Sequence, residues 1–424
     1  MKINKLLAAR AKARREGWLP MVRSEADERA LLDGYYFDAR AAGHAVEFFP
    51  RFLCHAKNRF AGQPFELLPW QRDDLIAPLF GWMRPEGTRR FTRSYVEIPK
   101  KNGKSTLAAG VALYLATADG EVGNKVFCAA TDKEQAKIVY GECVGMVEVS
   151  ERLAACCKIN LANNTITHRG SRSVIKPLSR VVKSKEGLDG SAIIDELHAW
   201  DGWELWDCLK YMGAARSQPM LFVITTAGED MEGPCYANHE YAKKILAGTT
   251  VEHRFFPLIY GSDVETLQKG RKKWDRLRDP KTHAAINPSY GATIDPKELA
   301  SDVNEALERP GELPRLLRYR FNCWTRSESV WLPTDSHDNN RGDYTAESLE
   351  GQECRGGFDL AKVSDLTALT LMFQDADDLE LYRRLTYFWL PEKRAWEVRD
   401  RVPYLQWAED PRTHLTITDG DVTD

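Results

Sequence analysis

The side chains best suited to chemistry stand in the run Gly103-Lys104-Ser105-Thr106, between a short apolar segment and a stretch with helical apolar spacing. At the start of a helix, backbone N–H groups point toward a bound anion, a lysine adds positive charge, and a serine hydroxyl can hold Mg²⁺. The run therefore indicates a loop that binds nucleotide phosphates. The general pattern has an earlier glycine, and Ile98 occupies that position here.

A pair of carboxylates, Asp195-Glu196, follows an apolar run about ninety residues downstream of Ser105. Parallel strands bind ligands at their carboxyl ends, so Asp195 could hold a Mg²⁺ ion together with Ser105. Glu196 could orient and deprotonate an attacking water. Taken alone, an acidic pair at a strand end is more often a solvated surface feature. The phosphate-binding run upstream favours the catalytic interpretation.

These residues need a parallel sheet with helices on both faces to bring them together. The apolar runs predict strands at 95–98, 125–130, 191–194 and 220–224. They also predict a hairpin of 165–167 with 173–175, and helices from 107 onward, over 132–148 and over 203–216. The expected fold class is thus α/β, with a P-loop NTPase domain.

Two further groups are candidates near this site, and each has two interpretations. The run Thr225-Thr226-Ala227-Gly228 ends a strand; it could sense the γ-phosphate or simply form a tight turn. Gln71 follows Trp70 upstream of the phosphate-binding run. A glutamine amide can pair with the adenine edge through one donor and one acceptor, yet a Trp-Gln pair before a helix is more often packing.

A second domain is indicated near the C-terminus. A polar stretch over 333–352 reads as a linker, and strands are expected at 356–360, 368–373 and 379–390. An aspartate in the first strand of such a meander, here Asp359, is how ribonuclease-H-like nucleases place a metal ligand. The expected organisation is a basic helical region at 1–60, an ATPase domain at 61–332 with a helical subdomain at 262–323, and a partial ribonuclease-H-like domain at 353–424.

The amino-acid composition says little about which molecules the protein binds. The 424 residues carry a formal charge of -3, so contact with nucleic acid must come from local basic patches. Residues 1–24 hold seven Lys or Arg against one acid, which fits either a solvated helical tail or a nucleic-acid- or partner-binding arm. No apolar run reaches the roughly 18 residues of a membrane span. The nine cysteines include no C-x-x-C pair, which argues against a zinc site.

With these segments in order, the chain resembles the large terminase subunit of tailed bacteriophages, from about Phe65 to the C-terminus. The resemblance rests on the Trp70-Gln71 pair, the glycine-poor loop over 99–105, and the strand end over 193–198. It also includes the Thr225–Gly228 run, similar to the family's coupling motif, and Gly357-Phe358-Asp359 with Asp365, similar to its first nuclease motif.

The resemblance implies a role for each matching residue. Gln71 would bind adenine, while Lys104 with Ser105 and Asp195 would bind phosphate and Mg²⁺. Glu196 would be the catalytic base. The remaining implied sites are the loop residues Lys100 and Lys101, the coupling residues Thr225, Thr226 and Gly228, and a nuclease site at Asp359 and Asp365 using Mg²⁺ or Mn²⁺. Since the loop carries lysine where the family has arginine, Arg180 and Arg216 are alternative sources of a guanidinium.

The family acts on double-stranded DNA in the host cytoplasm, as a homo-oligomeric ring on the capsid portal with a small terminase subunit and without a membrane. Two alternatives are a superfamily-2 DExH helicase, which also has an Asp-Glu-x-His run, and a non-catalytic assembly protein with a degenerate P-loop fold. We also expect the nuclease domain to be incomplete, since only about 65 residues follow Asp359.

Overall fold

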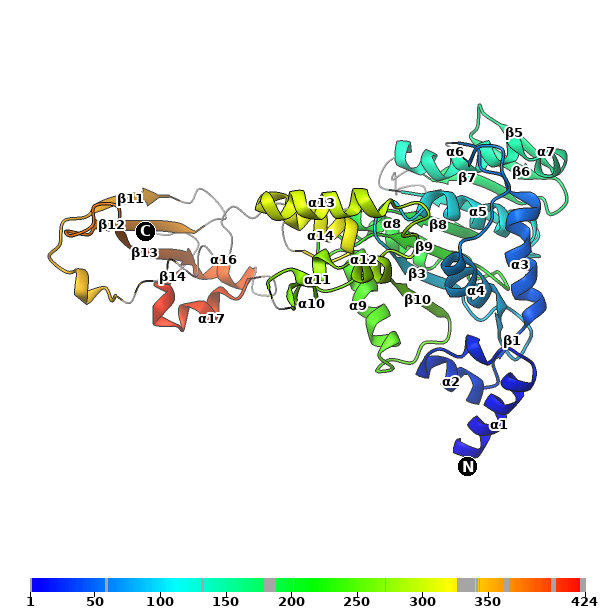
Figure 1. Ribbon diagram of the computed structural model, residues 1–424, viewed down its shortest axis with the longest axis horizontal. Helices are drawn as coiled ribbons and strands as arrows, with labels where there is room; N and C mark the ends of the chain where they lie inside the picture. Colours follow the sequence, from blue (N-terminus) through cyan, green and yellow to red (C-terminus); the bar gives the residue numbers. More distant parts are fainter. Residues whose placement is uncertain are drawn as a thin grey trace. The chain divides into compact units, whose positions relative to one another are not determined.

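The computed structural model describes residues 2–57, 60–130, 133–178, 188–200, 202–270, 272–325, 340, 342, 344–360, 366–397 and 402–419. The chain divides into two units, Met1–Trp331 and Leu332–Asp424. Figure 1 labels their helices and strands. No helix among the described residues is long and apolar enough to cross a membrane.

The first unit is built on an eight-stranded sheet in the order β10-β3-β9-β8-β4-β7-β6-β5 (Figure 1). Its first six strands pair in parallel, and the last two pairings, β7 with β6 and β6 with β5, are antiparallel. The parallel strands are β10 (Phe255–Ile259), β3 (Arg93–Glu97), β9 (Leu221–Thr225), β8 (Ser191–Asp195), β4 (Lys125–Ala129) and β7 (Val174–Leu178). The antiparallel strands are β6 (Thr165–His168) and β5 (Cys157–Asn160). The predicted parallel sheet is confirmed.

Helices cover both faces of this sheet because its strands are apolar on both sides. Along β3, Val96 packs into one hydrophobic cluster and Tyr95 into the other. One face is covered by α3 (Ala39–Phe52), α4 (Ala77–Gly81), α5 (Lys104–Thr117), α6 (Lys133–Val149) and α7 (Glu151–Cys156). The other face is covered by α8 (Glu204–Lys210) and α9 (Pro234–Leu246). Helix α5 is buried at every position from Leu107 to Ala116, as expected for a helix that is apolar all round.

The N-terminal residues pack on the same unit. Helix α1 spans Lys2–Arg15 and α2 spans Glu25–Leu32, and the strands β1 (Tyr36–Phe37) and β2 (Trp82–Met83) pair with each other. The Trp18 ring contacts both Phe37 and Trp82, and a buried 2.7 Å ion pair joins Arg90 to Asp27.

A helical segment follows the sheet and has a hydrophobic cluster of its own. It contains α10 (Val264–Gln268), α11 (Asp275–Arg278), α12 (Pro280–Ile286), α13 (Pro296–Glu308) and α14 (Leu313–Phe321). This segment belongs to the first unit, and its last described residues are Asn322 to Thr325.

The second unit contains a four-stranded sheet in the order β11-β12-β13-β14. Its strands are β11 (Arg355–Asp359), β12 (Thr367–Gln374), β13 (Tyr382–Pro391) and β14 (Leu415–Thr418), with α16 (Glu392–Glu397) and α17 (Tyr404–Ala408) between the last two. The three-stranded meander is confirmed, and β14 adds to it parallel to β13. Of the expected linker at 333–352, residues 333–339, 341 and 343 lie outside the described residues.

Two predictions about elements were wrong or incomplete. The helix expected over 203–216 ends at Lys210, and Gly213, with a left-handed φ of 81° in the turn that follows, cannot continue it. Strand β10 was not predicted, since Pro257 interrupts its apolar run. Proline is tolerated there because β10 is an edge strand and needs to pair on one side only.

Candidate nucleotide-binding site

The loop between β3 and α5 is shaped for anion binding at a helix N-terminus. Gly103 precedes α5 with φ 82° and Lys101 has φ 72°, so the backbone turns sharply before the helix. A side chain with a Cβ is strained in this region, and only Gly103 adopts it freely. The side chain of Asn102 is fully buried beneath the loop, where it donates to the carbonyl of Pro99 at 3.2 Å. The loop is therefore fixed by hydrogen bonds as well as by its single glycine.

The ammonium group of Lys104 points into this loop. It donates to the carbonyls of Ile98 and Pro99, both at 3.3 Å, and to the hydroxyl of Thr226. Burial lowers the pKa of Lys104, and the nearby carboxylates of Glu196 and Asp195 act in the opposite direction. Lys104 thus joins the phosphate-binding loop directly to the end of β9.

Ser105 and Asp195 meet across the site. The Ser105 hydroxyl donates to Asp195 Oδ2 at 2.7 Å, and the Asp195 carboxylate is 5% exposed. Burial, followed by the charge of Glu196, raises the pKa of Asp195 to about 6. A hydroxyl and a carboxylate are hard oxygen ligands, and a buried carboxylate with a raised pKa is stabilised by a cation. The two residues therefore fit Mg²⁺, which in such a site neutralises phosphate charge.

Glu196 stands beside them in a strained conformation, with φ 53°. Its Oε2 lies 3.1 Å from Nδ1 of His198, which is also 3.2 Å from the Thr225 hydroxyl. Burial alone would raise the pKa of Glu196. The contact with His198 and the charges of Lys104, His198 and Lys100 outweigh burial and lower this pKa to about 2. Glu196 is therefore ionised at neutral pH and can accept a hydrogen bond from water.

The run at the end of β9 contacts both sides of this site. The Thr225 hydroxyl accepts from the His198 backbone at 3.1 Å, while the Thr226 hydroxyl accepts from Lys104. A Cβ on Gly228 would lie 3.1 Å from His198 and 3.2 Å from Trp324, so these two side chains would have to shift by a few tenths of an ångström to admit it. The run is thus connected to the phosphate-binding loop and to the carboxylate pair.

The other predicted residues also lie at or near the loop. Gln71 is buried at the start of a π-helical turn (Gln71–Ile76), and its Oε1 accepts from the Leu68 backbone at 2.9 Å. Its Nε2 would lie 3.8 Å from a Cβ built on Gly103. The Lys100 ammonium lies 3.7 Å from the centre of the Tyr319 ring. Thr106 lies in the first turn of α5, and the Lys101 side chain is exposed.

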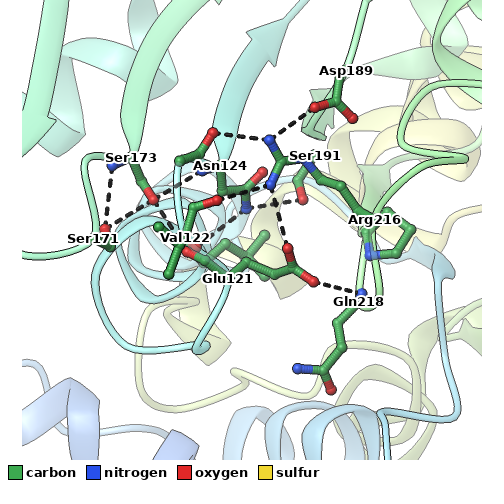
Figure 2. Close-up of polar contacts among 12 residues, drawn as sticks. Glu121, Val122, Asn124, Ser171, Ser173, Asp189, Ser191, Arg216 and Gln218 are labelled. Atoms are coloured by element: carbon green, nitrogen blue, oxygen red, sulfur yellow. Dashed lines mark hydrogen bonds and ion pairs between the residues drawn. The ribbon is translucent and has the colours of Figure 1, made fainter.

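Arg216 is not part of this site. Its guanidinium binds Asp189 at 2.8 Å and Glu121 at 3.3 Å, together with the carbonyls of Val122 and Gly123 (Figure 2). These partners precede β8 and β4, whereas the site follows the carboxyl ends of the strands. The proposed role of Arg216 as a guanidinium source for the site of its own chain was therefore wrong. Arg180 lies outside the described residues.

The predicted nuclease residues do not come together as the residues of the nucleotide-binding site do. Asp359 is exposed at the end of the edge strand β11, and Asp365 lies outside the described residues. Strand β14, which was not among the three predicted strands of this unit, pairs with β13 at the other edge of the sheet. Asp419, which follows β14, is therefore three strands from Asp359, a lateral separation of about 14 Å. Among the described residues, no group of three or more His, Cys, Asp or Glu side chains could hold a metal ion.

Several residues that sequence reasoning missed complete the first site. Asn102 Oδ1 accepts from the Ser289 backbone at 3.0 Å, and its Nδ2 donates to Asn287 Oδ1 at 3.2 Å. Thr293 donates to the carbonyl of Lys101 at 2.7 Å. The helical segment thus clamps the phosphate-binding loop. The only sequence signal was the Asn287-Pro288 turn, which has no chemistry of its own.

Comparisons with known proteins agree with this geometry. Residues 69–244 match the family model for the ATPase domain of the terminase large subunit, and residues 271–409 match the model for its endonuclease domain. The sheet and the loop define an ATPase of the P-loop type. The chain belongs to the terminase large subunit family.

Individual relatives match over different lengths. The large terminase subunit of Enterobacteria phage HK97 is 26% identical over 377 residues, which cover 86% of this chain and 69% of that protein. Protein YmfN of Escherichia coli (strain K12) is 28% identical over 255 residues, so the match spans about half of each, 56% of this chain and 53% of YmfN. The crystal structure of the HK97 large terminase shares the fold, with 22% identity and a TM-score of 0.56, covering 90% of this chain and 75% of that chain.

Proposed function

We propose that this chain is the ATP-hydrolysing subunit of a viral DNA-packaging motor, which drives double-stranded DNA into a capsid. One observation carries the proposal: the 2.7 Å contact of Ser105 with Asp195, which brings a magnesium-binding pair to the helix that begins after Gly103. Glu196 follows directly, which gives the site a base beside its metal ligands.

Each residue has a defined part in this proposal. Lys104 and the N–H groups at the start of α5 bind the phosphates, with Thr106, Lys100 and Lys101 around them. Ser105 and Asp195 hold Mg²⁺. Glu196, oriented by His198, positions a water for attack and accepts its proton. Gln71 binds adenine. Thr225, Thr226 and Gly228 couple hydrolysis to movement, since Thr226 contacts Lys104 and Thr225 contacts His198.

The proposal extends to the partners and to the second unit. The ATPase domain occupies 61–332 with the helical subdomain 262–323, after a basic region at 1–60. The linker 333–352 leads to the nuclease domain at 353–424, where Asp359 and Asp365 would bind Mg²⁺ or Mn²⁺. The motor would act in the host cytoplasm as a ring on the portal, with the small terminase subunit. We do not favour a helicase or a non-catalytic assembly protein.

The test is release of phosphate from ATP with Mg²⁺, comparing the parent chain with Ser105→Ala. The matched control is Ser173→Ala, which removes another hydroxyl (Figure 2), one that directly precedes β7 and so lies at the amino ends of the strands, away from the site. We expect turnover by the parent and by the control, and a loss of about 10²-fold or more in Ser105→Ala. Equal turnover in all three would contradict the proposal.

A further inference from the structure

The side chain of Asn322 joins the ends of three neighbouring strands. Asn322 follows α14 in a left-handed conformation, φ 54°, and is 2% exposed. Its Oδ1 accepts from the backbone N–H of Ala227, just after β9, at 2.6 Å. Its Nδ2 donates to Glu97 Oε1 at the end of β3 at 3.1 Å, and to the carbonyl of Tyr260 just after β10 at 2.7 Å. Strands β10, β3 and β9 are adjacent in the sheet. One amide therefore links the carboxyl ends of three neighbouring strands, which is where the site lies.

The partners fix the orientation of this amide. The oxygen faces an N–H group, and the nitrogen faces a carboxylate and a carbonyl, so a flipped amide would lose all three hydrogen bonds. The acceptor bond holds Ala227, which lies between Thr226 and Gly228. Since Thr226 contacts Lys104, only Ala227 and Thr226 stand between Asn322 and the phosphate-binding lysine.

Glu97 anchors the other side. Its carboxylate is fully buried and also accepts from the Tyr95 hydroxyl at 2.5 Å, from His239 at 2.9 Å and from the Trp324 indole at 3.3 Å. Glu97 immediately precedes Ile98, whose carbonyl binds Lys104. A buried carboxylate depends on such donors, so loss of one disturbs the base of the phosphate-binding loop.

We infer that Asn322 is a positioning residue for ATP hydrolysis, which holds the coupling run over 225–228 in register with the phosphate-binding loop. The inference rests on the proposed ATPase function. It also means that the part matching the endonuclease model, residues 271–409, supplies a residue that completes the ATPase site. The bonds of Asn287 and Ser289 with Asn102 give this segment a second hold on the same loop.

The decisive variant is Asn322→Asp, which keeps the shape but places a second carboxylate 3.1 Å from Glu97. The matched control is Asn124→Asp. Asn124 is also fully buried and also donates through its amide, to Leu115 and Ser191 (Figure 2), but it precedes β4 and so lies at the amino ends of the strands, away from the site. Melting temperatures of both variants establish that they are folded. Like charges at such a distance repel, so the coupling run should move in the first variant only.

We expect Asn322→Asp to lower kcat for ATP by about 10- to 100-fold with KM for ATP changed less than about threefold. Asn124→Asp should keep the parent's kcat and KM. Adding Glu97→Gln to Asn322→Asp removes the repulsion between the two carboxylates and should restore part of kcat, since only the bond to the Tyr260 carbonyl is then still missing. If Asn322→Asp does not fold, Asn322→Gly removes the amide while accepting the left-handed backbone, and should show the same kcat loss.

Three results would overturn the inference. The first is a kcat for Asn322→Asp or Asn322→Gly equal to that of Asn124→Asp. The second is a raised KM for ATP with an unchanged kcat. The third is a kcat that does not recover when Glu97→Gln is added to Asn322→Asp. Failure of the proposed function looks different, because the parent chain itself would then hydrolyse no ATP.

Discussion

The hydroxyl of Ser105 and the carboxylate of Asp195 lie 2.7 Å apart, although 90 residues separate them in the chain. Ser105 is in the first turn of α5, and Asp195 ends β8, which packs directly beside that helix. The sheet itself therefore assembles the site. Helix α5 and strand β8 are buried along their lengths, and their polar ends meet at the carboxyl ends of the strands.

Asp195 should make the ligand-free protein less stable as pH rises. Folding raises its pKa from 3.8 to about 6, so the folded state binds this proton more tightly than the unfolded state. The resulting stabilisation is complete below pH 4 and is lost between about pH 4 and 6, with an upper bound of about 3 kcal/mol. Asp195→Asn should therefore raise the melting temperature at pH 8, and raise it less at pH 5.

Calorimetry without Mg²⁺ at both pH values measures this difference, with the exposed Asp207→Asn as control. Mg²⁺ should then stabilise the parent at pH 8 but not Asp195→Asn. A melting temperature for Asp195→Asn that is lower than the parent's at pH 8 would contradict the claim that the ionised Asp195 carboxylate destabilises the ligand-free protein.

Gln71 should distinguish adenine from other bases. The Leu68 N–H orients its amide, and the carbonyl retains a lone pair for the exocyclic amine while Nε2 can donate to the ring. Gln71→Ala should weaken binding of ATP by about 1–2 kcal/mol more than binding of a nucleotide that lacks this amine. Titration calorimetry with both nucleotides measures the difference. Equal losses would mean that Gln71 only packs against the loop.

We expect the 424-residue chain not to nick plasmid DNA with Mg²⁺ or Mn²⁺. A two-metal site holds its ions about 3.5–4 Å apart between carboxylates. Asp359 is exposed on β11, and Asp419 follows the strand at the other edge, about 14 Å away laterally. The measurement is conversion of supercoiled plasmid by the parent chain and by Asp359→Ala. Nicking by the parent that Asp359→Ala abolishes would show that the site is complete.

The elements that carry the site could be predicted from local sequence. Strand β8 is a run of small and apolar residues that ends in the first of two acids, and α5 is a longer apolar run that follows a glycine, so composition indicates both. Ser105 and Asp195 could then be paired, because parallel strands place their carboxyl ends at one edge.

The supporting residues could not be predicted, because their roles depend on tertiary contacts between distant segments. Asn322 follows α14 in the left-handed conformation that asparagine often takes after a helix, so its position alone indicates no further role, and its partner Ala227 is 95 residues away. His198 was visible in sequence, but its contact with Glu196 depends on the left-handed turn at Glu196, which no local pattern indicates. The role predicted for Arg216 was wrong for the same reason. The sequence does not show whether a charged residue lies at the amino ends or at the carboxyl ends of the strands.

The most direct test of the proposed chemistry is ATP turnover by Glu196→Gln, alongside ATP binding by the same variant. The substitution keeps the side chain's size and removes its negative charge beside Ser105 and Asp195. We expect Glu196→Gln to bind ATP within a few-fold of the parent and to hydrolyse it about 10²–10⁴-fold more slowly. Hydrolysis within a few-fold of the parent would contradict the assignment of Glu196 as the base.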